Sequence, residues 1–374
     1  MADGPSHAPV TASQATTSQA SSPSSRPLPA IDQARQTLAQ QINRDAIRRA
    51  VSALYRTATR STAPQADPYL LLLQQGDRAL AKGDYYSAQA AFRQACRQQP
   101  ESLEAYEGLA MTLSASDQFA EAAATYEKIV ELAARKERAA SMPAWALRDL
   151  DQVRTVARHN QALALCRTGE LAKAQDIYRN LLADDPSNTR FRFNLAAILQ
   201  ARGQASEAIN AWRDVVAAAD SLPAADAAFA WSALGQLRMD LGDAASAMDA
   251  YVHATKLTPD DASAWFNFSV AARACGSLGR AVAAAKRAVA LSGRNALLHE
   301  HLGDMYLDLY RQSNDAAHLG SAVAAWQESL SLNPRQPELA GRVEQYQKVL
   351  RVLPAASRPA GGTSPTTGTL PTVN

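Results

Sequence analysis

The chain has 374 residues, of which 47% are hydrophobic but only 6% aromatic, and its formal net charge at pH 7 is +2. This balance gives no overall electrostatic attraction to nucleic acid or to an acidic membrane. Three cysteines are too few for a disulfide-stapled scaffold, and no apolar run reaches the roughly 20 residues of a membrane-spanning helix. The start of the chain lacks the basic and apolar regions of a secretory signal. We therefore expect a soluble cytoplasmic protein; a native leader missing from this sequence would make it periplasmic or secreted instead.

The two ends of the chain have the composition of disordered segments. Residues 1–30 and 353–374 are rich in Ser, Thr, Ala and Pro and contain few large apolar side chains. Such segments bury too little surface to offset the entropy of an ordered chain. We expect both to be flexible tails around a helical middle, where apolar residues recur every three or four positions.

Residues 31–60 predict a basic amphipathic helix. Its apolar stripe includes Leu38, Ile42 and Leu54, and its polar side carries six arginines against two aspartates. A helix of this kind can cover the end of a helical array, bind a partner, or lie on a membrane surface. Residues 61–68 are then a linker.

From residue 69 to residue 336 the sequence repeats itself with a period of about 34 residues. In the first unit, fixed positions of the repeat hold Gly76, Ala88, Phe92, Ala95 and Pro100, and the unit that starts at Ala228 holds equivalent residues. Small residues allow two helices to approach closely, and the aromatic residue fills the gap toward the next unit. Glycines such as Gly83 permit a left-handed turn between the helices, and the proline ends the second helix.

This spacing of small, aromatic and proline residues is clearest between Trp231 and Pro259 and resembles the tetratricopeptide repeat (TPR). The resemblance implies an all-α, right-handed superhelical solenoid of about seven helix–turn–helix units over residues 69–336. A further amphipathic helix at 337–352 is expected to cap its C-terminal end, because a terminal repeat leaves an apolar face to cover.

One departure from the period is an insertion of 18 residues before Thr155. Divided between two helices near 137–154, it predicts a longer helical hairpin at this point of the array. One hypothesis is that Trp145 on this hairpin makes a secondary contact with a partner. The alternative is that Trp145 packs against its own hairpin.

In the TPR family the first helix of each unit lines a concave wall that binds peptides or partner helices, so the resemblance implies protein–protein recognition. Three phenylalanines are expected to face solvent on this wall, and asparagines recur at the sixth position of a unit, where an amide can donate to and accept from a peptide backbone. The alternative is that these asparagines bond to neighbouring helices. The candidate groove residues are Asn160, Arg190, Phe193, Asn194, Phe229, Phe266, Asn267 and His301.

The sequence shows no arrangement typical of catalysis, and no cofactor or metal is expected. His299, His301 and Asp304 lie near one another, but the spacing of the two histidines puts them on different helix faces. Binding of a terminal carboxylate by a lysine–arginine clamp is disfavoured because Glu107 stands where a cation is needed.

We therefore expect a non-enzymatic adaptor that holds a peptide or partner helix in its groove. Two alternatives stay open. One is an exported component of a bacterial-type cell-envelope assembly or secretion complex. The other is a regulatory or substrate-recruiting subunit of an enzyme whose catalytic part is on another chain.

Overall fold

The structure is a computed structural model that describes residues 67–139 and 144–352. The predicted tails at 1–30 and 353–374, the predicted helix at 31–60 and most of the predicted linker lie outside these residues. Within them, every regular element is helical: fifteen α-helices, α3 to α17, and one short 3-10 turn (Ala219–Ser221). The prediction of an all-α solenoid is confirmed.

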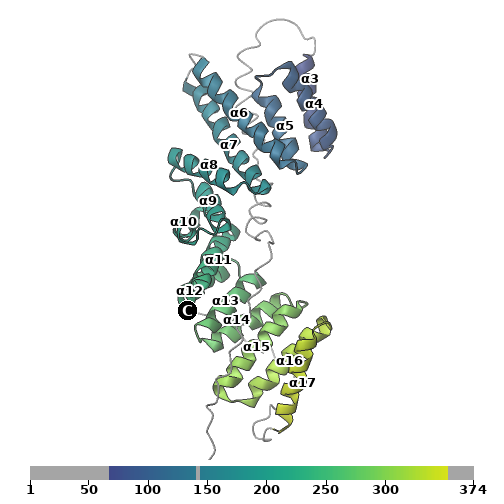
Figure 1. Cartoon of the computed structure of the whole chain (residues 1–374), viewed down its shortest axis with the longest axis vertical. Helices are drawn as coiled ribbons and strands as arrows, with labels where there is room; N and C mark the ends of the chain where they lie inside the picture. The colour runs from purple at the N-terminus through teal and green to yellow at the C-terminus, as the bar shows by residue number, and fades with distance from the viewer. Residues whose placement is uncertain (1–66, 140–143, 353–374) are drawn as a thin grey trace, which may run out of the picture.

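The helices form pairs that follow one another along the chain, and each helix packs mainly against the next (Figure 1). The first helices of the pairs are α3 (Pro68–Ala81), α5 (Leu103–Ala115), α7 (Ala144–Thr168), α9 (Thr189–Ala201), α11 (Ala224–Asp240), α13 (Ala262–Ala274) and α15 (Ala296–Ser313). The second helices are α4 (Tyr85–Gln98), α6 (Phe119–Ala139), α8 (Leu171–Asp184), α10 (Ala205–Ala217), α12 (Ala244–Leu257), α14 (Leu278–Leu291) and α16 (Ala316–Leu332). The last helix, α17 (Pro337–Val352), packs against α16 and buries Leu339 and Val343.

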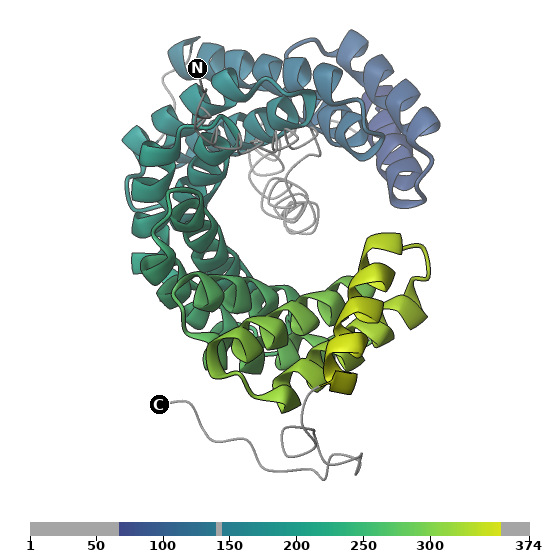
Figure 2. The ribbon, with the colours of Figure 1, turned by 60° about the horizontal axis from the view of Figure 1, so that its bottom comes forward.

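The pairs stack into a curved array around an open centre (Figure 2). Contacts between alternate helices join first helices, α3 with α5 and α11 with α13. Because the elements on the inside of a curve are closer together than those on the outside, the first helices form the concave side. We call this side the inner wall.

The turns between the helices of a pair follow from a few local residues. Gly83, Gly169, Gly203 and Gly242 have φ between 72° and 84°, as the sequence predicted for a left-handed turn. The equivalent turn between α5 and α6 instead contains Asp117 at φ 59°, a conformation that costs energy when a side chain is present. Pro100, like the prolines of three other units, lies two residues beyond the end of its helix.

Close approach of the helices depends on glycine facing an aromatic ring. A Cβ atom built on Gly76 would lie 2.7 Å from Cζ of Phe92, and a Cβ on Gly108 would also collide with that ring. Phe92 of α4 is therefore held between its own first helix and the first helix of the next pair. Tyr251 packs on Gly235 in the same way, so the aromatic position of the repeat fills the gap between successive units.

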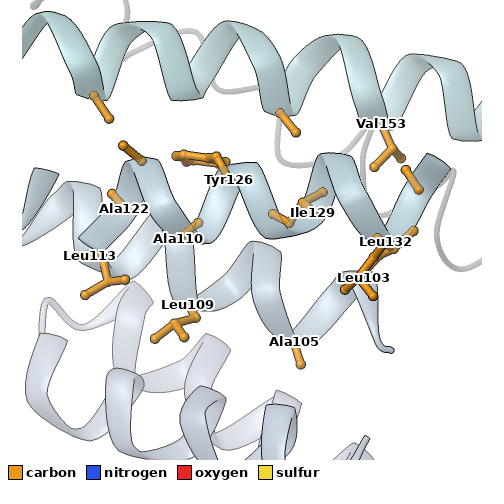
Figure 3. Close-up of a cluster of buried hydrophobic side chains, with 14 of the residues drawn as sticks. Leu103, Ala105, Leu109, Ala110, Leu113, Ala122, Tyr126, Ile129, Leu132 and Val153 are labelled. Atoms are coloured by element: carbon orange, nitrogen blue, oxygen red, sulfur yellow. The ribbon is translucent and has the colours of Figure 1, made fainter. Parts of the chain in front are cut away.

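The helices α6 and α7 are the longest second and first helices, with 21 and 25 residues. Their inner faces belong to one apolar cluster that includes Leu132 and Leu150 (Figure 3 shows the part around Leu132). Arg154 of α7 pairs with Glu137 of α6 at 2.8 Å and with Asp151. Residue 145 lies in α7, but its side chain is outside the described part of the structure, so the partner contact of Trp145 stays a prediction.

Candidate functional site

The inner wall contains a small pocket between α5, α6 and α7. Its lining is mostly apolar, with Glu107 of α5 and Asn160 of α7 as polar members. Tyr126, Ile129 and Val153 form much of the apolar lining and lie between the helices that Figure 3 shows. Asn160 thus lies on the inner wall, as its position in the repeat predicted.

The asparagines of the wall meet tyrosines from the aromatic position of the preceding unit. Burial raises the pKa of Tyr126 to about 12, and the nearby side chains of Ser114 and Asn160 partly offset this rise. Asn194 interacts in the same way with Tyr178, whose pKa is raised, chiefly by burial. Part of the hydrogen-bonding capacity of both asparagines is therefore used inside the protein, and the sequence analysis did not foresee these tyrosines.

Asn194 is the most enclosed of the predicted groove residues, with only 5% of its surface exposed. Its Nδ2 atom is buried and makes no hydrogen bond of standard geometry among the described residues, although the amide approaches the Tyr178 hydroxyl. A buried donor without an acceptor costs about 1–3 kcal/mol relative to a satisfied one. Asn194 is therefore held beside a tyrosine in a position that leaves its amide incompletely bonded.

Arg190 lies on the same helix face as Asn194, and its charge influences the pKa values of His159 and Asp226. Arg190 is exposed and precedes Asn194 by four residues on α9, so both are on one face of the helix. His159 bonds through Nδ1 to the Tyr178 hydroxyl at 3.1 Å, and burial, aided by the charge of Arg190, lowers its pKa to about 4. Burial also raises the pKa of Asp226 at the start of α11, an effect that Arg190 partly offsets.

The phenylalanines do not form the exposed surface that the sequence analysis expected. Phe193 is only 9% exposed and meets the ring of Trp212 edge to face, with the centroids 5.0 Å apart. Phe229 is half-buried, and its ring centroid lies 5.6 Å from that of Phe193 and 5.8 Å from that of Trp212. The expectation of solvent-facing rings was wrong for Phe193, because Trp212 comes from the second helix of the pair and covers it.

The C-terminal part of the predicted groove is similarly occupied by internal contacts. Phe266 packs on His301 with the centroids 4.5 Å apart, and His301 Nε2 is 2.9 Å from the hydroxyl of Ser269. That hydroxyl also donates to the carbonyl of Ala281, so His301 supplies the proton of the shared bond. Burial lowers the His301 pKa to about 4. Asn267 is half-buried beside Phe266 on α13.

The chemistry available along the wall is that of hydrogen bonding and charge. Both wall histidines have pKa values near 4, which makes them neutral at pH 7. The described residues contain no group of three or more side chains that could hold a metal ion. No helix in residues 67–139 and 144–352 combines the length and apolarity needed to cross a membrane.

Comparison with known proteins agrees with this architecture. A family model described as tetratricopeptide repeat matches residues 73–137, 159–223 and 232–296, together just over half of the chain. The chain belongs to the tetratricopeptide repeat family. The TPR matches fall on the helices from α3 to α14, and each covers most or all of two successive pairs.

Solved structures with similar folds are themselves distant in sequence. The C-terminal part of a TPR repeat-containing protein from Cytophaga hutchinsonii has a TM-score of 0.56 at 14% identity, and the match covers 72% of this chain and 98% of that one. A tetratricopeptide repeat protein from Parabacteroides merdae gives 0.46 at 15% identity, covering 75% and 99%. MamA from Desulfovibrio magneticus gives 0.42 at 17% identity, covering 49% and 96%. A search of curated protein sequences finds no relative.

Proposed function

We propose that this TPR protein is a non-catalytic adaptor whose inner wall binds an extended segment of a partner protein. The observation that supports it best is that the exposed Arg190 and the incompletely bonded amide of Asn194 lie one turn apart on the same face of α9. An extended peptide carries a carbonyl oxygen at every residue, and the Asn194 amide would bond one of them after turning outward from its buried position. A carboxylate on the same peptide would pair with Arg190.

The proposed contact is centred on α7 and α9. Asn160 and Asn194 hold the same position in successive units, and Asn160 lies at the pocket of the wall. Their tyrosine partners fix the amides from behind, which reduces the entropy that binding would cost. Phe193, by contrast, supports the wall from within and is not proposed to touch the ligand.

A peptide display experiment on the full-length protein tests this proposal. Random-sequence peptides are selected on the immobilised chain, and the enriched ones are titrated against the Arg190→Ala and Asn194→Ala variants. We expect each variant to weaken binding by about tenfold, equivalent to about 1.4 kcal/mol. Arg213→Ala, which removes an exposed arginine from the second helix α10, is the matched control and should bind like the wild type.

Thermal unfolding of the same variants separates a ligand contact from a structural one. Arg190 is exposed, so Arg190→Ala should change stability little, whereas Asn194→Ala removes a buried side chain beside Tyr178 and should lower the free energy of unfolding by about 1 kcal/mol. The proposal fails if no peptide is enriched over an unrelated helical protein, or if the enriched peptides bind the Arg190→Ala/Asn194→Ala double variant as well as the wild type.

A further inference from the structure

The N-terminal part of the inner wall is acidic as well as apolar. Asp77 of α3 and Glu104 and Glu107 of α5 are the carboxylates of this surface, which we call the acidic inner wall. The half-buried Glu104 has a pKa of about 7, raised chiefly by burial and also by the negative charge of Asp77. The charge of Asp77 thus adds to the cost of ionising Glu104, and a cationic neighbour would lower that cost.

Apolar surface borders these carboxylates. Leu70 of α3 is 49% exposed, and the pocket beside Glu107 is lined mainly by apolar side chains of α5, α6 and α7. Ile129 and Val153 of this lining are labelled in Figure 3. The acidic inner wall thus combines an exposed leucine and a small apolar pocket with negative charge, which complements the apolar and basic faces of a basic amphipathic helix.

The chain itself contains such a helix in its sequence. Residues 31–60 combine a predicted apolar stripe with six arginines and only two aspartates. Six residues separate this segment from Asp67, and an extended chain of that length spans about 20 Å. Neighbouring helices in a bundle are about 8–10 Å apart, so the tether reaches α3, α5 and α7. A short tether also raises the effective concentration of the segment to the millimolar range.

The end face of the array is a poorer site for this segment. The outward positions of α3 hold Leu71, Gln75 and Arg78, all exposed. The equivalent positions of α11 are the buried residues Ala230, Leu234 and Leu237. At the N-terminal end of the array, the exposed face of α3 therefore carries the polar side chains of Gln75 and Arg78, which suit contact with water. The positive charge of Arg78 would also repel a basic helix.

From this complementarity we infer that residues 31–60 form a helix that binds the acidic inner wall across α3, α5 and α7 and acts as an internal ligand. An external partner that uses this part of the wall must displace it. The inference goes beyond the proposed function and does not depend on Arg190 or Asn194, although both surfaces include α7 and the pocket beside Asn160.

Hydrogen exchange of the full-length chain, followed by mass spectrometry, tests this arrangement. In the wild type we expect amides of residues 31–60 to exchange at least tenfold more slowly than an unstructured peptide. Glu104→Lys/Glu107→Lys on the wall and Arg44→Glu/Arg48→Glu on the segment should each remove most of this protection. Combining the two charge reversals should restore part of it. A neutral pair, Glu104→Gln/Glu107→Gln, should have an intermediate effect.

Two controls make the outcome decisive. Glu127→Lys/Asp176→Lys introduces the same charge change on the exposed faces of the second helices α6 and α8 and should leave the protection unchanged. The protection of α4 and α6 amides in the same experiment reports whether each variant is folded. The inference is overturned if residues 31–60 exchange freely in the wild type, if wall reversals leave their protection intact, or if protection depends on protein concentration, as binding to a second copy would require.

Discussion

The contact between Gly76 and Phe92 gives a quantitative test of how the repeat is packed. In Gly76→Ala, the new methyl group would lie 2.7 Å from Cε1 and Cζ of Phe92, well inside the usual carbon–carbon contact of about 3.5–4.0 Å. The ring cannot move away easily, because a Cβ built on Gly108 of the next first helix would also collide with it. The substitution must therefore separate α3 from α4 or rotate Phe92.

The magnitude follows from two opposing effects. Alanine in a helix interior is favoured over glycine by about 1 kcal/mol. Inserting a methylene into a well-packed core costs about 1–3 kcal/mol. We expect Gly76→Ala to lower the free energy of unfolding by up to about 2 kcal/mol. In the matched control Gly341→Ala, on an exposed face of α17 with no atom within 4 Å of the new Cβ, stability should rise by about 1 kcal/mol.

Native-state hydrogen exchange is the appropriate assay, because repeat proteins open unit by unit and do not always unfold in one step. Amides of α3 and α4 should lose protection in Gly76→Ala, and amides of α17 should gain it in Gly341→Ala. Adding Phe92→Leu should make the alanine at position 76 less costly, which a double-mutant cycle measures as coupling between the two sites. Equal or greater protection of α3 in Gly76→Ala would refute the packing argument.

Three further predictions address single residues. Asp117→Gly should raise the free energy of unfolding by up to about 1 kcal/mol in urea titrations, because glycine adopts φ 59° without strain; a loss of stability would show that the side chain matters more. His159 and His301 have pKa values of about 4 in the folded protein and about 6.5 in the unfolded chain. Protonation therefore favours the unfolded chain, so the free energy of unfolding is highest above pH 6.5 with respect to these groups and falls as the pH drops toward 4. Urea titrations at pH 7 and 5 should differ by about 2 kcal/mol per histidine, and by less in His159→Gln/His301→Gln. Cys96 is buried with a pKa of about 11, so a thiol reagent at pH 8 should label the half-exposed Cys275 first, and the reverse order would contradict this burial.

The internal contacts of the wall change which residues are suitable for functional tests. Phe193 packs against Trp212, so its replacement by alanine should cost about 3–5 kcal/mol of stability and would confuse a binding assay. Arg190 is exposed and can be removed without opening the core. Variants at Arg190 and Asn194 therefore test binding in the groove, whereas a variant at Phe193 tests the stability of the fold.

The helical architecture could be predicted from the sequence because its determinants are local. Gly83 and the other turn glycines permit the left-handed turn, and Pro100 ends its helix because proline cannot continue one. The left-handed turn at Asp117 was not predicted, because the prediction relied on glycine and a residue with a side chain is uncommon at positive φ. The period also indicated that small residues such as Gly76 allow two helices to approach closely, but the contact of Gly76 with the ring of Phe92 is seen only in the structure.

The sequence alone thus determined the class of fold and the helix pairs, because helical periodicity and turn chemistry act over a few residues. The exposure of those wall residues was decided by the tertiary structure. Trp212 covers Phe193 from another helix, and Tyr178 lies beside Asn194, which is only 5% exposed. Periodicity gives the direction of a side chain, but burial depends on which side chains of neighbouring helices fill the space in front of it.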